Sequence, residues 1–149
     1  MRIGDICTMQ TIYCTRSETV QGAALLMRKH HVGDIVVVDQ PGAEVVPVGI
    51  VTDRDIVVSV IALGLDPASL EVSDVMSADL LTTAEEDDVY ETIERMRQRG
   101  IRRVPVVDAA GTLRGIVSVD DLLEFLAQEM GELSRISAHQ QAHEKTARQ

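Results

Sequence analysis

Two short stretches of similar sequence decide the fold: GIVTDRD at residues 49–55 and GIVSVDD at residues 115–121. Each begins with a glycine and β-branched residues that favour a strand, and then has a hydroxyl residue followed three positions later by an aspartate. A hydroxyl with an acid three residues on, next to an apolar run, is typical of a helix N-terminus. Each stretch therefore predicts a strand that leads directly into a helix, whose free N–H groups and dipole favour an anion.

The sequence around these stretches is an internal repeat. Asp5 and Asp74 are 69 residues apart, and the same offset aligns residues 35–38 with residues 104–107. Beyond this apolar strand the offset falls to 66, because Gly49 aligns with Gly115. The deletion lies in a predicted hairpin loop, where a change of length is tolerated.

Each copy predicts the order β-α-β-β-α. A short extended piece (residues 11–15 or 80–84) precedes an amphipathic helix, two strands joined by a turn at Gly42 or Gly111, and a second helix. Gly64 is expected to end the second helix of the first copy. About 60 residues alone bury too little surface for comfortable stability, so we expect the copies to pair their apolar faces. The prediction is an α/β (α+β) fold of tandem repeats with pseudo-twofold symmetry and clefts between the sheets.

The expected domains are repeat 1 at residues 1–66, repeat 2 at residues 67–128, and a C-terminal extension at residues 129–149. Apolar residues from Leu122 to Ile136 keep helical spacing beyond the repeat, which predicts one long helix to about Ser137 with a stripe that packs on a second chain. The polar residues from 138 onward are expected to fray.

Composition limits the possible functions. The chain has a formal net charge of −10, which disfavours general binding to nucleic acid or anionic membranes. No stretch has the roughly 20 apolar residues of a membrane span, and the N-terminus lacks a signal-peptide pattern. Cys7 and Cys14 form no CxxC pair, which suggests reduced thiols and a cytoplasmic location. Aromatic residues make up 2%, so the core is expected to be aliphatic.

The repeated motif has two interpretations. One is purely structural: a glycine at a tight strand start and a helix cap worth about 1 kcal/mol. In the other, the hydroxyl and the helix N–H groups hold a phosphate, the aspartate accepts hydrogen bonds from ribose hydroxyls, and the glycine admits the ligand close to the backbone. The presence of two copies at matching positions favours the second interpretation.

Residues 3–63 and 72–126 resemble the CBS domain, named after cystathionine β-synthase. RVPVVD at residues 103–108 is similar to that family's second-strand signature, and the two motifs above are similar to its ribose and phosphate motif. The resemblance implies a Bateman module, a pseudo-twofold pair of units that often dimerises into a disc of four. It also implies reversible binding of AMP, ADP, ATP or S-adenosylmethionine in the clefts, and regulation of an unidentified protein target rather than catalysis.

Carried over position by position, the resemblance implies ligand contacts in both copies. The candidates are Thr52 and Ser118 for phosphate or ribose, Asp55 and Asp121 for ribose, Val32 and Ile101 for the adenine slot, and Arg102 and Arg103 for phosphates, with Arg54 as a further charge in the first motif.

The copies differ beside the second strand, where Gly33 and Asp34 align with Arg102 and Arg103. Because arginines favour a phosphate and an acid disfavours it, we expect the second copy's cleft to be the better site for a charged nucleotide.

Three alternatives remain open. They are a dimerisation module with vestigial clefts, an enzyme of unknown chemistry, and a redox or metal sensor. No nucleophile–base pair or metal set supports an enzyme. His139 and His143 share a helical face but lack a third ligand, so a metal site is not predicted. His30 and His31 are expected to end a helix, where positive charge is favourable.

Overall fold

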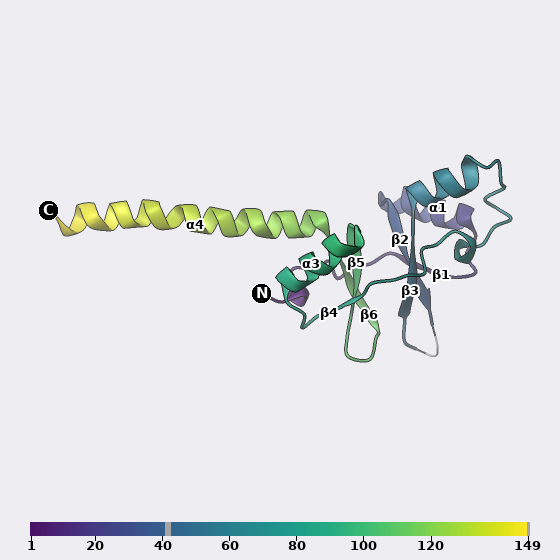
Figure 1. Cartoon of the computed structure of the whole chain (residues 1–149), viewed down its shortest axis with the longest axis horizontal. Helices are drawn as coiled ribbons and strands as arrows, with labels where there is room; N and C mark the ends of the chain where they lie inside the picture. The colour runs from purple at the N-terminus through teal and green to yellow at the C-terminus, as the bar shows by residue number, and fades with distance from the viewer. Residues whose placement is uncertain (41–42, 149) are drawn as a thin grey trace.

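The computed structural model describes residues 1–40 and 43–148 and shows two small sheets side by side with a long helix leading away (Figure 1). The first repeat contains β1 (Tyr13–Thr15), α1 (Val20–His30), β2 (Asp34–Asp39), β3 (Val46–Thr52) and α2 (Asp53–Ile56), which continues as a π-helical turn at Val57–Ile61. The second contains β4 (Thr83–Ala84), α3 (Val89–Arg99), β5 (Arg103–Val107), β6 (Leu113–Ser118) and α4 (Val119–Ala147).

The two sheets have the same topology, which confirms the predicted tandem β-α-β-β-α fold. Their strand orders are β1-β2-β3 and β4-β5-β6, and in each the first pair is parallel and the second antiparallel. The antiparallel register shifts after Val37 in one sheet and after Val106 in the other, at aligned positions of the repeat. The predicted turn at Gly42 lies outside the described residues.

Helix ends follow the local sequence. Thr19 Oγ1 accepts the Gly22 N–H at 2.9 Å and caps α1, which ends at His31 in a left-handed conformation with φ 54°. Asp88 caps α3, and Gly100 ends it with φ 64°. Gly64 has φ 69°, three residues after the π-helical turn ends, as expected for a stop.

The two hydrophobic cores exchange their entry segments. The 3-10 turn Ile3–Asp5 precedes the first repeat, yet the fully buried Ile3 packs in the core of the second with Val89 and Val104. The 3-10 turn Val72–Asp74 precedes the second repeat, and its buried Val72 packs in the core of the first. Each repeat is therefore completed by a segment that the sequence places at the start of the other.

Backbone hydrogen bonds fix this exchange at equivalent positions. Thr8 and Ile116 exchange N–H···O bonds of 2.9 and 3.0 Å, and Ile50 and Ser77 exchange bonds of 3.2 and 2.9 Å. The motif glycines permit the approach: a Cβ on Gly115 would lie 2.5 Å from the Thr8 carbonyl oxygen. A Cβ on Gly49 would likewise lie 2.7 Å from the Ser77 carbonyl oxygen. The glycines thus admit another part of the chain at the positions where the motif predicts a ligand.

Helix α4 is longer than predicted. It begins at Val119 and continues to Ala147, ten residues beyond Ser137, through the segment expected to fray. The reason is local: residues 138–147 include three alanines, two glutamines, one glutamate and one lysine, which favour helix, and contain neither glycine nor proline. An ion pair of 2.8 Å between Arg148 and Glu144 lies at its end. The prediction of a frayed tail was therefore wrong within the described residues.

Candidate functional site

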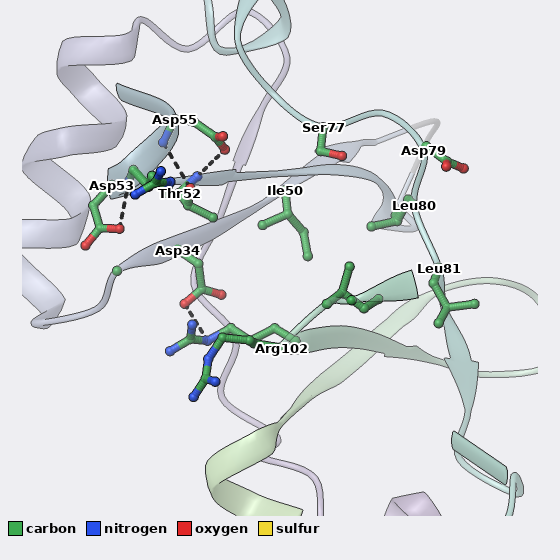
Figure 2. A pocket seen from close by; sticks show the side chains of 15 residues that line it. Asp34, Ile50, Thr52, Asp53, Asp55, Ser77, Asp79, Leu80, Leu81 and Arg102 are labelled. Carbon is green, nitrogen blue, oxygen red and sulfur yellow. Dashed lines mark hydrogen bonds and ion pairs between the residues drawn. The ribbon is translucent and has the colours of Figure 1, made fainter. Parts of the chain in front are cut away.

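The main cavity lies between the two repeats and has a volume of about 580 Å³. In Figure 2, Thr52, Asp53 and Asp55 lie at one end and Leu80 and Leu81 at the other. The lining residues come from the end of β3 and the start of α2, from the segment entering the second repeat, and from both loops that precede a central strand: Gly33, Asp34, Ile50, Thr52, Asp53, Arg54, Asp55, Ser77, Asp79, Leu80, Leu81, Gly100, Ile101, Arg102 and Arg103.

The first motif forms a capping box at the edge of this cavity. Thr52 Oγ1 accepts the Asp55 N–H at 3.1 Å, and Asp55 Oδ2 accepts the Thr52 N–H at 2.9 Å. Ser118 and Asp121 make the same pair of bonds at 3.2 and 2.7 Å, so the structure confirms that both motifs cap helices. A carboxylate has about four lone-pair sites, so the cap leaves Asp55 acceptor capacity for a hydroxyl of a ligand.

An ion pair joins the two repeats at the cavity. Arg103 Nε lies 2.9 Å from Asp34 Oδ1, and the Asp34 side chain is only 9% exposed. Figure 2 shows Asp34 pointing toward the arginines beside it, one of which is labelled Arg102. Burial raises the pKa of Asp34, Arg103 opposes this by favouring the carboxylate, and Asp53 adds a smaller repulsion that raises the pKa further. The net effect is a raised pKa, and Arg103 is the charge that favours the ionised form of Asp34.

An apolar wall occupies the other part of the cavity. Ile50 on β3, Leu80 and Leu81 in the segment before β4, and Ile101 in the turn before β5 all line it. All four side chains are only partly buried, so they keep apolar surface that a planar ring could cover. The cavity thus combines an apolar wall, a carboxylate with spare acceptor capacity and a set of arginines.

The structure brings together six of the nine predicted site residues. Thr52, Arg54, Asp55, Ile101, Arg102 and Arg103 line the cavity, whereas Val32, Ser118 and Asp121 are not among its lining residues. Asp121 instead lines a second, smaller pocket of about 230 Å³ together with Asp5 and Glu124.

Arg102 and Arg103 share a cavity with the first motif and not with the second. Arg102 and Arg103 were assigned to a cleft with the second motif, but they line the cavity that contains the first motif. Asp34, expected to weaken a separate first site, lies in the same cavity and neutralises part of the Arg103 charge. The reason is the pseudo-twofold packing, which places the turns before β2 and β5 side by side.

The far wall of the cavity was not predicted from the sequence. Ser77, Asp79, Leu80 and Leu81 belong to the segment that enters the second repeat, and Ser77 is bound to Ile50 on β3 of the first. The repeat alignment would have pointed to this segment only if the exchange of entry segments had been known, because no local pattern marks it.

Other candidate chemistry lies away from the cavity. Among residues 1–40 and 43–148, no three histidine, cysteine or acidic side chains are grouped to hold a metal ion. Burial, with Glu18, raises the pKa of Cys14 to about 11, and burial raises the pKa of Cys7 as well.

In the same described part of the chain, no helix combines the length and apolar character needed to cross a membrane.

Comparison with known proteins identifies the family. The family model for the CBS domain matches residues 3–61 and again residues 72–128. The chain belongs to the CBS domain family. As a pair of CBS domains, it is a regulatory type of module.

Individual CBS relatives resemble the chain to different extents. The CBS domain-containing protein YhcV of Bacillus subtilis is 35% identical over 143 residues, which cover 95% of this chain and 98% of YhcV. The uncharacterised protein MK0525 of Methanopyrus kandleri is 35% identical over 122 residues, 82% of this chain but only 61% of MK0525.

A solved CBS pair also has the same fold. The CBS domain pair of protein MJ0100, in complex with 5′-methylthioadenosine and S-adenosyl-L-methionine, superposes with a TM-score of 0.73 at 26% identity. The superposition covers 87% of this chain and 98% of that one.

Proposed function

We propose that this CBS pair binds an adenosyl ligand reversibly in the cavity between its repeats and transmits the change to a protein partner. The observation that carries the proposal is the composition of that cavity, where Asp55, Arg102, Arg103 and an apolar wall converge from both repeats. The related CBS pair of MJ0100 holds two adenosyl compounds, which supports this ligand class. AMP, ADP, ATP and S-adenosylmethionine are the candidates.

Each part of the cavity suits one part of such a ligand. The apolar wall of Ile50, Leu80 and Ile101 would cover the adenine ring, and Asp55 would accept hydrogen bonds from ribose hydroxyls. Arg102 and Arg103 would donate to a phosphate or carboxylate, because a guanidinium offers paired donors to such groups.

The ion pair between Asp34 and Arg103 offers a mechanism of signalling. A phosphate in the cavity would compete with Asp34 for Arg103, and these residues belong to different repeats. If Arg103 turns to the ligand, Asp34 loses its main counter-ion while it remains buried. The contact between repeats is then weakened, so the ligand favours a different arrangement of the two units by its differential contacts. A homodimer would pass this change to a protein target.

Isothermal titration with the four candidate ligands tests the proposal on a matched pair of variants. Asp55→Ala and Asp121→Ala each remove the carboxylate of one capping box, but only Asp55 lines the cavity. We expect affinity to fall at least tenfold, about 1.4 kcal/mol, in Asp55→Ala and to stay within a factor of two in Asp121→Ala.

Three results would count against the proposal. Loss of binding only in Asp121→Ala would move the site to the second motif, and equal losses would indicate a general effect of the caps. No binding of any of the four ligands at millimolar concentration would favour the dimerisation module, in which the motifs only cap helices. The variant Asp34→Asn adds a test of the mechanism: releasing Arg103 should tighten ATP binding, roughly tenfold.

A further inference from the structure

The cavity between the repeats has walls of opposite charge. The first repeat lines it with three carboxylates, from Asp34, Asp53 and Asp55, and the second repeat lines it with two guanidinium groups, from Arg102 and Arg103. In Figure 2, Asp34 lies between Arg102 and the other two carboxylates. A ligand in the cavity therefore meets acidic side chains from one repeat and arginines from the other.

Two further charged residues that line the cavity do not change this division. Arg54 belongs to the first repeat, so that side carries three acids and one arginine, a formal charge of −2. Asp79 belongs to the second repeat, but its Oδ2 lies 2.6 Å from Arg99 Nη1, which neutralises it. Arg102 and Arg103 then leave the side of the second repeat with a formal charge of +2.

The acid at position 53 is not needed to start its helix. Val119 is the aligned residue of the second repeat, and it begins α4 with the same backbone bond. The Asp53 N–H donates to the Gly33 carbonyl at 2.9 Å. The Val119 N–H likewise donates to the Arg102 carbonyl at 2.9 Å. Since an apolar residue makes the same turn, the helix start does not explain the carboxylate of Asp53.

Each wall of the cavity keeps a charge without a counter-ion. Asp34 and Arg103 pair at 2.9 Å, whereas among residues 1–40 and 43–148 neither Asp53 nor Arg102 forms an ion pair, and both are exposed. Glycine at position 33 leaves one oxygen of Asp53 uncovered, because a Cβ there would lie 3.0 Å from Asp53 Oδ2. The cavity thus presents a carboxylate and a guanidinium, on opposite walls, that a ligand can neutralise.

We propose that this cavity selects an adenosyl ligand with a zwitterionic tail, the chemical class of S-adenosylmethionine, over the adenine nucleotides, and that Asp53 determines the preference. This choice of ligand class rests on the proposed function. AMP, ADP and ATP add only anionic groups to adenosine, whereas S-adenosylmethionine adds a sulfonium, an ammonium and a carboxylate. With the ribose on Asp55, a cationic group of the tail meets Asp53 and the carboxylate of the tail meets Arg102.

The acidic wall disfavours a polyphosphate. Phosphate oxygens would compete with Asp34 for Arg103 and would approach the unpaired carboxylate of Asp53. Contacts between like charges lower affinity and so discriminate between ligands. The whole chain adds to this effect, because its formal net charge of −10 attracts a cationic ligand and repels an anionic one. Asp53 thus favours one class of ligand and disfavours the other.

Isothermal titration of the full chain with S-adenosylmethionine, 5′-methylthioadenosine and AMP tests the choice of ligand. 5′-Methylthioadenosine keeps the adenosyl group and the sulfur atom but lacks the charged amino-acid tail. We expect S-adenosylmethionine to bind at least about tenfold more tightly than either of the other compounds. Equal affinities for S-adenosylmethionine and 5′-methylthioadenosine would overturn the proposal, because the charged tail would then contribute nothing.

The variant Asp53→Asn tests the residue. Asparagine keeps a side-chain oxygen for the Arg54 N–H, which donates to Asp53 Oδ1 at 2.8 Å, so the helix start is retained. We expect binding of S-adenosylmethionine to weaken about tenfold, and binding of AMP to stay unchanged or to tighten by up to about threefold. The control Asp120→Asn removes an acid from the first turn of α4, outside the cavity, and should change both affinities by less than about twofold.

The results would separate this ligand preference from the proposed function. Binding of AMP that depends on Asp55, without tighter binding of S-adenosylmethionine, would leave the proposed function standing and overturn the choice of ligand. An unchanged ratio of the two affinities in Asp53→Asn would overturn the role of Asp53. No binding of any of the three compounds at millimolar concentration would overturn both proposals.

Discussion

A methyl group added at Gly115 should destabilise the whole module, although the change is small and lies in a strand. An alanine Cβ would lie 2.5 Å from the carbonyl oxygen of Thr8 and 3.3 Å from the Cys7 sulfur. Real Cβ atoms do not approach backbone oxygen so closely, so the segment around Thr8 must withdraw. That segment connects the fully buried Ile3 to the rest of the chain.

The size of the effect follows from what the withdrawal breaks. Overpacking of this kind costs about 1–3 kcal/mol. The two backbone bonds between Thr8 and Ile116, 2.9 and 3.0 Å long, contribute about 0.5–1.5 kcal/mol each when made. If the segment around Thr8 withdraws, the steric clash is relieved but the two hydrogen bonds are lost. The overpacking cost and the hydrogen-bond cost therefore do not add in full. We expect the free energy of unfolding to fall by about 2–4 kcal/mol.

Urea denaturation followed by circular dichroism measures this loss. With a slope of about 2 kcal/mol per molar urea, the midpoint of Gly115→Ala should fall by about 1–2 M. The control is Gly131→Ala in α4, where a Cβ would meet nothing within 4 Å and alanine favours the helix, so the midpoint should hold or rise. A Gly115→Ala midpoint equal to that of the native chain would refute the argument from close approach.

Two further predictions concern titratable groups. The N–H of Ala84, with Thr83 and Arg95, holds the pKa of Asp87 below its usual range, so its stabilisation is present above the unfolded-state pKa and is lost as pH falls below about 4. Asp87→Asn should therefore be less stable at pH 7 by about 1–2 kcal/mol and show a shallower acid loss of its urea midpoint; parallel pH curves would contradict this. Cys14, with a pKa of about 11, should react with iodoacetamide at pH 8 about 200-fold more slowly than a free cysteine. Alkylation of Cys14 at the free rate, followed by mass spectrometry, would instead support a redox role.

Much of the fold could be predicted because its causes are local. The aligned strands 35–38 and 104–107, the caps at Thr52 and Ser118, and the stop at Gly64 each depend on a few neighbouring residues. The internal repeat then predicted the same strand and helix order for both halves of the chain. What could not be predicted is the exchange of the entry segments, because nothing in the sequence near Ile3 or Val72 states which core will bury it.

Several residues of the candidate site were predicted from the sequence, but the way in which the two repeats bring them together was not. The motif residues Thr52 and Asp55 and the arginines at 102 and 103 do line a cavity, but they do so together, across the pseudo-twofold axis. A resemblance carried over residue by residue assigns each position within its own repeat. It does not indicate which motif that position faces once the two repeats are packed together. The ion pair between Asp34 and Arg103 is likewise a property of the packed pair of repeats.

Because the entry segments are exchanged, neither half of this chain has a complete hydrophobic core without the other half. A chain cut between the repeats would leave each fragment without the piece that seals its own interior, Ile3 for one and Val72 for the other. Two copies of a single unit could still seal each other by reciprocal donation, forming an intertwined dimer. Duplication and fusion of the gene for one unit would convert that dimer into this chain and keep its contacts. The short stretch between the repeats would then be the segment that linked the two copies.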